Sequence, residues 1–381
     1  MSLFGWRVPL TAWVLSRALV IGVAVVAGLW LGLPTRGVDP AVPHALAFLG
    51  GWDTTWYLDI ARHGYTHDAG QVGTVFTNLA FFPLLPGIMA AFLAVGINPF
   101  IGALVVANLA FLGALAAFGA LTAGRQDGTA ATRAVWTLAL LPTAVYCSLA
   151  YTESIALVCA VAAALAAVRG RYLLAGVVAA VGSLSRPTGI LVVVLIGLLA
   201  LQSSPVLALR LRRAAAAAAP SVLAVGAFLG WMAVERGSAL LPFEAQRAWD
   251  RGQLGVGLVS AAPDELRAGW GHLVNGTGGA AWHATIRDLV VLVVALALLA
   301  MLWRAEGGLR SPWVVYSLVV LAVPLSSGTL TSLARFSLMA FPLLWPLADW
   351  LGRDRRRVHA GLAVAGGGIV QAVLQLLMRS H

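Results

Sequence analysis

A short segment near the N-terminus carries the side chains best suited to acid–base chemistry. Residues 51–65 read GWDTTWYLDIARHGY. As a helix, this segment places two aromatic and two ionisable side chains on one face: Trp52, Trp56, Asp59 and His63. Asp53 stands at the start of the helix, where a carboxylate can cap backbone amides or take a proton from a reacting group. An interfacial helix anchored by its aromatic residues would explain the Trp and Tyr side chains without catalysis.

Two further ionisable side chains stand beside apolar runs. Glu153 precedes an apolar segment, and Arg186 lies within residues 183–189 between two short apolar runs. Charged groups at membrane depth are costly, so by default they are candidates for function. The alternative is that Glu153 and Arg186 pair with each other across a helix interface, since opposite charges at one depth satisfy each other.

Apolar helices must position these side chains. Of 381 residues, 60% are hydrophobic and 10% are charged, whereas a soluble domain carries about 25% charged residues. Apolar runs of spanning length, about 20 residues, recur along the chain. The net charge of +10 comes mostly from arginines in short turns between these runs, not from a folded basic face of the kind that binds nucleic acid. We therefore predict an all-α, polytopic transmembrane bundle, with one integral membrane domain over residues 1–381 of a cell membrane and no nucleic-acid partner.

Arginine-rich turns orient the predicted helices. They hold Arg125 with Arg133, Arg169 with Arg171, Arg210 with Arg212 and Arg213, Arg304 with Arg310, and Arg353 with Arg355, Arg356 and Arg357. The positive-inside rule places all of these turns in the cytoplasm, and Arg7 and Arg17 favour a cytoplasmic start. One threading of about 11 crossings satisfies this placement. Its candidate spans are 9–33, 99–123, 134–149, 154–168, 173–184, 188–202, 214–234, 286–303, 313–326, 336–350 and 358–378.

The same threading leaves two large loops outside the cytoplasm. Residues 34–98 form an outer loop with short interfacial helices, and residues 235–285 form the second large outer loop. Residues 79–96 are apolar but short, and Pro83 and Pro86 break their start. We interpret them as a re-entrant or interfacial helix on the outer side, because a crossing here would invert the loops that follow.

In order along the chain, these segments resemble the GPI mannosyltransferase II (PIG-V-like) family, within the C-type (GT-C) glycosyltransferase superfamily. The matching positions are Trp52-Asp53, Trp56-Tyr57, Ile60-Ala61, Gly64-Tyr65, Phe81-Phe82-Pro83-Leu84 with Pro86, Tyr151-Thr152-Glu153-Ser154, Ser185-Arg186 with Gly189, Gln246 with Trp249, and Arg335-Phe336. Each piece is short, and their ordered combination is much more specific than any one of them. The composition looks bacterial, whereas GPI anchors are eukaryotic, so the acceptor does not carry over.

The resemblance implies an inverting mannosyltransferase with a GT-C-like helical fold. Such an enzyme moves mannose from a polyprenyl-phosphate-mannose donor to a hydroxyl of a glycolipid or glycan, forming an α-mannoside at the extracytoplasmic face. Asp53 matches the superfamily's first-loop aspartate and is the predicted general base. The predicted substrate-binding residues are Trp52, Trp56, Tyr57, Arg62, His63, Tyr151, Glu153, Arg186, Gln246, Trp249 and Arg335. Arg186 and Arg335 are the main candidates to bind the leaving phosphate, because a guanidinium donates two parallel bonds. Arg62 and His63 are the weaker candidates for this role.

Metal use and two rival functions stay open at this level. Some C-type enzymes bind a divalent cation through carboxylates in the first and second outer loops, where this chain has Asp53 and Glu153. The sequence shows no dense Asp/Glu/His cluster, so we expect no metal and no other cofactor. The rivals are a transferase for another polyprenyl-linked sugar or a protein acceptor, and a transporter or flippase of lipid-linked sugars. Transporters keep coupling charges near the bilayer midplane, whereas our threading places the charges at outer helix ends and so favours an enzyme.

Overall fold

The computed structural model describes residues 4–31, 39–67, 69–249, 263–264, 266–267, 270–271, 274–275, 279–326, 330 and 333–379. In these residues the regular elements are helices, apart from an isolated bridge between Val72 and Val75. The predicted all-α class is therefore confirmed. The chain forms two compact units, which we call unit 1 (Met1–Thr66, Phe81–Val225 and Leu347–His381) and unit 2 (His67–Ala80 and Gly226–Pro346).

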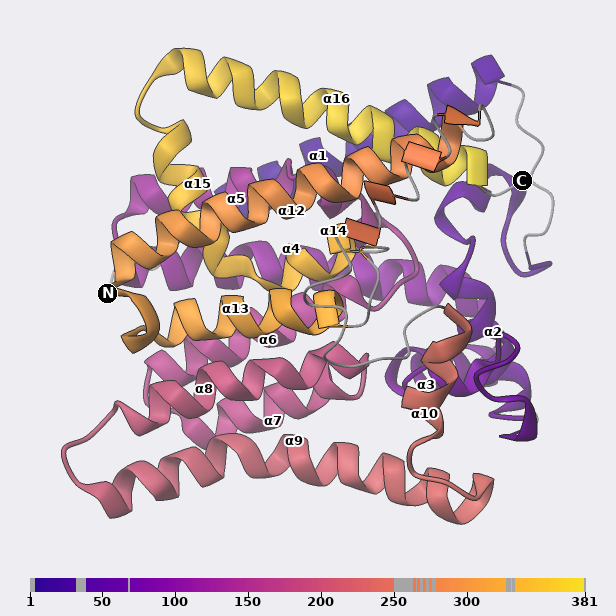
Figure 1. Ribbon diagram of the computed structural model, residues 1–381, viewed down its shortest axis with the longest axis horizontal. Coiled ribbons are helices and arrows are strands. Elements are labelled where there is room, and N and C mark those ends of the chain that lie inside the picture. The colour runs from indigo at the N-terminus through magenta and orange to yellow at the C-terminus, as the bar shows by residue number, and fades with distance from the viewer. Residues whose placement is uncertain are drawn as a thin grey trace. The chain divides into compact units, whose positions relative to one another are not determined.

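Unit 1 is built on helices α4 and α6, which pack against each other and against α5 and α7 respectively. Its longer helices are α1 (Arg7–Leu31), α4 (Pro99–Arg125), α5 (Gly128–Ala139), α6 (Glu153–Val168), α7 (Tyr172–Ser183), α8 (Val192–Leu201), the first part of α9 (Leu207–Arg236) and α16 (Arg355–Arg379). The shorter ones are η1 (His44–Leu49), α2 (Asp53–His63), α3 (Leu84–Ala94), η4 (Pro142–Ser148) and η5 (Pro187–Leu191). The α-helices among these elements can be followed by label in Figure 1.

Unit 2 combines a segment of the first predicted outer loop with the region after α9. Its elements are η2 (Ala69–Gln71), η3 (Asn78–Ala80), the end of α9, α10 (Leu241–Glu244), η6 (Ala245–Trp249), α12 (Gly279–Glu306), η7 (Gly308–Arg310), α13 (Pro312–Ser326), α14 (Leu333–Phe336), η8 (Ser337–Met339), η9 (Phe341–Leu343) and the start of α15 (Leu344–Leu351). Trp313 and Trp345 pack edge to face with ring centroids 5.0 Å apart. The buried Tyr316 hydroxyl donates to the Met339 carbonyl at 2.8 Å.

Several helices are long and apolar enough to cross a membrane. In the described residues there are 5 such stretches, at 7–27, 99–125, 207–236, 286–306 and 355–374, or 6 if η4 and α6 form one broken span. This finding supports a multi-pass membrane protein, while the count of about 11 crossings stays a prediction. The sides of the membrane also stay a prediction.

Two predicted spans are not continuous helices. Residues 134–149 divide into the end of α5 and the 3₁₀ helix η4, because Pro142 lacks an amide proton and forces Leu141 before it into an extended conformation (ψ 130°). The axis then bends by 106° between η4 and α6. Residues 336–350 are likewise divided among the last residue of α14, η8, η9 and α15, and Pro342 lies in η9 before α15 begins.

The first predicted outer loop does carry short helices. Helix α3 has 11 residues, so at about 1.5 Å per residue it is roughly 16 Å long and by itself too short for a hydrocarbon core of about 30 Å. This length fits the re-entrant or interfacial interpretation of residues 79–96. Of the second predicted outer loop, 235–285, residues 250–262 and several up to 278 lie outside the described residues.

Several loops that the sequence analysis predicts on the outer side of the membrane meet at one end of unit 1. The Leu84 amide donates to the Leu184 carbonyl at 3.0 Å, and the Ala150 amide donates to the Leu49 carbonyl at 3.3 Å. Helices α2 and α3 lie at the right-hand ends of the unit 1 helices, and the α8–α9 turn lies at the left-hand ends (Figure 1). A buried apolar cluster, including Tyr57, Leu85 and Phe100, joins α2, α3 and α4 below these loops.

Candidate active site

Asp53 begins helix α2, and Trp52 holds the N-cap position before it. Trp52 has φ +61°, the one positive φ of a non-glycine residue in the part of the chain that the structure describes. Such a conformation is uncommon for a bulky residue and is held in place only by the surrounding structure. Asp53 is half-buried in the first turn, where the helix dipole favours a negative charge. Asp53 therefore stands one position inside the helix rather than at the cap.

Hydrogen bonds connect the Asp53 turn to the loop before Glu153. The Tyr151 hydroxyl donates to the Gly51 carbonyl at 3.2 Å, and the Thr54 hydroxyl donates to the Ala150 carbonyl at 3.4 Å. Thr54 is fully buried, so this contact lies below the surface. The structure thus brings together two segments about 100 positions apart that the sequence analysis selected separately.

Glu153 and Arg186 form a buried ion pair. Arg186 Nη1 lies 3.1 Å from Glu153 Oε1, and the exposed fractions of the two side chains are 8% and 0%. Arg186 is extended, as a residue before a proline tends to be. Gly189 then lets the chain pass close to α7, since a Cβ there would lie 2.1 Å from the Gly182 carbonyl oxygen. The pairing alternative is therefore confirmed; a substrate role for either residue stays a prediction.

The aromatic side chains of α2 pack on the predicted aromatic–proline segment. The Phe81 ring lies 6.0 Å from the Trp56 ring in a stacked arrangement and 5.3 Å from the Tyr57 ring edge to face. The Tyr65 hydroxyl donates to the Phe81 carbonyl at 2.9 Å. Burial raises the pKa of Tyr65, so this hydroxyl stays protonated as a donor. The Trp56-Tyr57 pair and the Phe81 segment, which the sequence resemblance listed separately, are thus in direct contact.

Arg62 and His63 lie at the exposed end of α2, and both have acidic partners. Arg62 binds Asp39 through two contacts, Nη1 to Oδ2 at 2.6 Å and Nη2 to Oδ1 at 2.7 Å. His63 Nδ1 lies 3.0 Å from Asp59 Oδ1. Asp39 was not singled out by its sequence context, and its pairing weakens the case for Arg62 as a phosphate ligand.

The remaining predicted substrate-binding residues belong to unit 2. Gln246 Nε2 donates to the Ala80 carbonyl at 3.1 Å, and the Trp249 ring lies 4.8 Å from the Phe76 ring. Both contacts join η6 to the 67–80 segment of the first predicted outer loop. Arg335 is half-buried in α14. Their roles in substrate binding stay predictions.

Arg17 is a buried residue, although the sequence analysis used it only to orient the first predicted span. It lies within α1 with 5% exposure, and its Nη1 donates to the Ala144 carbonyl at 3.1 Å and to Ser148 Oγ at 2.5 Å. Its guanidinium also lies 4.5 Å above the Phe111 ring. The burial has a simple reason: Arg17 stands well inside an apolar run, and an ionisable residue there faces the protein interior.

Carboxylate, imidazole and thiol groups are spread thinly through the described residues. No group of three or more His, Cys, Asp or Glu side chains there could hold a metal ion. Glu153, one of the two carboxylates that the resemblance associates with a cation, is instead paired with Arg186. The expectation of an enzyme without metal or other cofactor stays a prediction.

Comparison with known proteins finds structures with a similar fold. No model of a protein family and no curated protein matches this chain. It is similar to the apo form of the oligosaccharyltransferase of Archaeoglobus fulgidus, at 14% identity and a TM-score of 0.50, over 98% of this chain and 56% of that chain. The same enzyme tethered to an acceptor peptide containing the NVT sequon aligns over 100% of this chain and 56% of that chain, at 13% identity and a TM-score of 0.50.

A third form, AglB in complex with an inhibitory peptide and a dolichol-phosphate, aligns at 14% identity with a TM-score of 0.50, again over 100% of this chain and 56% of that chain. The chain thus spans about half the length of the solved chains that it matches. At this identity the likeness shows a shared fold.

Proposed function

We propose that this chain is an inverting, polyprenyl-phosphate-mannose-dependent α-mannosyltransferase. The observation that carries the proposal is the tethering of the Asp53 turn to the loop before Glu153, in a fold shared with an oligosaccharyltransferase. The acceptor is a hydroxyl of a glycolipid or glycan at the extracytoplasmic face. A donor with a polyprenyl tail suits a chain with several helices of spanning length, because the tail partitions into hydrocarbon.

In this proposal Asp53 accepts the proton of the acceptor hydroxyl as its oxygen bonds to C1 of the sugar. The bond from C1 to the lipid phosphate breaks on the opposite side, and the phosphate keeps the electron pair. General-base assistance of this kind contributes about 10²–10⁴-fold in rate. Arg186 and Arg335 stabilise the charge that builds on the leaving phosphate. A half-buried carboxylate in the first turn of α2 suits the role of base, because it stays reachable by an acceptor.

The donor class and the acceptor class rest on different support. AglB was solved with a dolichol-phosphate, which is the class of lipid phosphate that we propose as the leaving group. The oligosaccharyltransferase was also solved with an acceptor peptide, so a peptide is the competing acceptor. Mannose rests on the sequence resemblance. The assay therefore offers glycolipid and peptide acceptors side by side with more than one polyprenyl-linked sugar.

Substitution of Asp53 by Asn tests the proposal. Asn keeps the size and hydrogen-bonding shape of the side chain but does not accept a proton at neutral pH. We expect Asp53→Asn to lower turnover by roughly 10²-fold or more, with donor binding and thermal stability close to the parent values. Transfer is measured from polyprenyl-phosphate mannose to extracted membrane acceptors, and donor binding is measured separately.

Asp127→Asn is the matched control. Asp127 caps α5 by accepting from the Ala130 amide at 2.7 Å, and Asn caps a helix equally well, so turnover should stay at the parent level. Near-normal turnover by Asp53→Asn would remove Asp53 from the mechanism. Asp59→Asn and Glu153→Gln would then show which other carboxylate is the base.

A further inference from the structure

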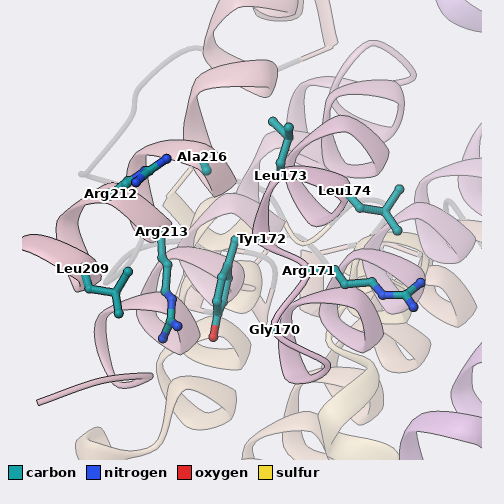
Figure 2. Close-up of a pocket in the computed structure, with 9 residues that line it drawn as sticks. All are labelled: Gly170, Arg171, Tyr172, Leu173, Leu174, Leu209, Arg212, Arg213 and Ala216. Atoms are coloured by element: carbon teal, nitrogen blue, oxygen red, sulfur yellow. The ribbon is translucent and has the colours of Figure 1, made fainter. Parts of the chain in front are cut away.

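A basic pocket opens between helices α7 and α9 in unit 1, at two of the arginine-rich turns and away from the candidate active site. Its volume is about 420 Å³, within the range of about 300–1,000 Å³ that small-molecule sites occupy. Its polar wall comes from Arg171, Arg212 and Arg213, and its apolar wall includes Leu173, Leu174 and Leu209. Figure 2 shows the Arg213 and Tyr172 side chains alongside each other, between Arg212 and Arg171.

The base of this pocket is held by specific contacts. Arg213 Nη1 donates to the Ser203 carbonyl at 3.1 Å and to Ser203 Oγ at 2.9 Å, and its guanidinium lies 5.5 Å above the Tyr172 ring. Helices α7 and α9 approach closely next to the pocket, since a Cβ on Gly176 would lie 2.6 Å from the Ala216 carbonyl oxygen. Arg213 thus forms a fixed cationic floor, and the exposed Arg171 and Arg212 flank it.

The elements that build the pocket carry no compensating carboxylate. From residue 154 to residue 234 the chain contains no Asp or Glu. Three arginines on such a stretch create a positive potential that an anionic group would neutralise. The pocket therefore complements a ligand with a phosphate-type charge.

The apolar wall favours a lipid over a free anion. Leu173, Leu174 and Leu209 keep exposed fractions of 62%, 47% and 37%, and they stand beside the arginines. An inorganic anion would leave these side chains uncovered, whereas the acyl chains of a phospholipid would cover them. Basic pockets between membrane helices on the cytoplasmic side bind anionic lipid headgroups in this way.

The location of the pocket agrees with that ligand. Helix α6 runs from Glu153 to Val168 over 16 residues, so its two ends are about 24 Å apart. The candidate active site lies at the Glu153 end, and Gly170 and Arg171 follow the other end. If the Glu153 end faces outward, the pocket lies at the cytoplasmic surface, where anionic lipids attract arginines.

We propose that this pocket is a binding site for an anionic glycerophospholipid of the cytoplasmic leaflet. Arg213 is the fixed contact for the headgroup phosphate, the exposed Arg171 and Arg212 supply positive charge on either side, and the leucines contact the acyl chains. The lipid then bridges the α6–α7 turn and the start of α9. This site is separate from the sugar donor site and does not depend on the proposed transferase activity.

The test measures lipid binding to the delipidated full-length protein in detergent, by native mass spectrometry with added phosphatidylglycerol or phosphatidylcholine. We expect phosphatidylglycerol to bind more tightly. Arg171→Gln with Arg212→Gln should weaken its binding by roughly fivefold for each arginine, about 25-fold together. Both side chains are exposed, so folding should be unaffected, and thermal unfolding without lipid checks this.

The matched control is Arg355→Gln with Arg356→Gln, which removes two exposed arginines from another arginine-rich turn. Equal losses in the two double variants would overturn the proposal in favour of a general surface charge, and so would equal binding of the two lipids. Leu173→Ser separates a lipid from a free anion. It should weaken phosphatidylglycerol binding, whereas unchanged binding together with full competition by inorganic phosphate would also overturn the lipid site.

Discussion

Unit 1 contains two arginine–carboxylate pairs that differ in geometry and in environment. Arg62 and Asp39 make two contacts of 2.6 and 2.7 Å, near the surface of the first predicted outer loop. Arg186 Nη1 lies 3.1 Å from Glu153 Oε1, and the two side chains are 8% and 0% exposed. The exposed pair has the shorter distances, but water competes for both of its partners. For the buried pair, each partner is what makes the burial of the other tolerable.

The comparison teaches that environment, more than contact distance, decides how much a pair matters. Exposed pairs contribute about 0–1 kcal/mol, whereas removing one partner of a buried pair costs about 3–5 kcal/mol because a charge is left without compensation. The expected results below test this contrast, from the largest effect to the smallest.

Breaking the buried pair should have the largest effect on stability. We expect Glu153→Ala to lower the free energy of unfolding by about 3–5 kcal/mol, measured by denaturant titration in detergent micelles. The double variant Glu153→Leu with Arg186→Met should recover most of that loss, because no charge then stays buried. If the two single losses simply add in the double variant, the residues are not coupled.

Arg186→Ala separates the structural role from donor binding. Donor affinity and stability are both measured for Arg186→Ala and for Glu153→Leu with Arg186→Met. A double variant that keeps its stability but loses donor affinity would favour phosphate binding by Arg186. Equal losses of affinity and stability would identify it as a structural partner of Glu153.

Arg17 extends the comparison to a buried arginine whose polar contacts are a carbonyl and a hydroxyl. We expect Arg17→Met to lower the free energy of unfolding by about 1–3 kcal/mol, because the Ala144 carbonyl and Ser148 hydroxyl lose their donor while the Met side chain keeps packing on Phe111. The measurement is the same titration, and Ser148→Ala completes a double-mutant cycle. Additive losses would mean that the Ser148 contact contributes nothing of its own.

The exposed pair should respond weakly. We expect Arg62→Gln to change the free energy of unfolding by about 0–1 kcal/mol, and the difference from the parent should shrink as salt is added. A loss as large as that of Glu153→Ala would show that Arg62 has a second role, such as the weaker phosphate contact that the resemblance allows.

The smallest expected effect is a dependence on acid pH. Partial burial opposes ionisation of Asp39, but hydrogen bonds from Arg62 and the Ala41 amide outweigh it and lower the pKa of Asp39 below its usual 3.8. A lowered pKa in the folded state means that this contribution is complete above the usual value and is lost as the pH falls below it. The stability difference between the parent and Arg62→Gln should therefore narrow on acidification below pH 3.8. A stability difference that does not change in this pH range would contradict the lowered pKa of Asp39.

Much of the local structure followed from sequence pattern. The helices α4, α6, α7, α13 and α16 lie close to predicted boundaries, because apolar runs bounded by arginines, glycines and prolines leave few alternatives. The failures are also local in origin. Pro142 and Pro342 stand inside predicted spans, and their effect was underweighted against the apolar character of the runs.

What the sequence determined by itself is the class of protein and the list of residues worth testing. Composition set the all-α membrane class, and motif order indicated a resemblance to the C-type superfamily. Only the tertiary structure showed which of those residues meet. It paired Glu153 with Arg186, joined the Asp53 turn to residues 150–151, and showed that Arg17 is a buried contact of η4. The reason is physical: hydropathy and spacing act along the chain, whereas a charge finds its partner only after packing has excluded water from both.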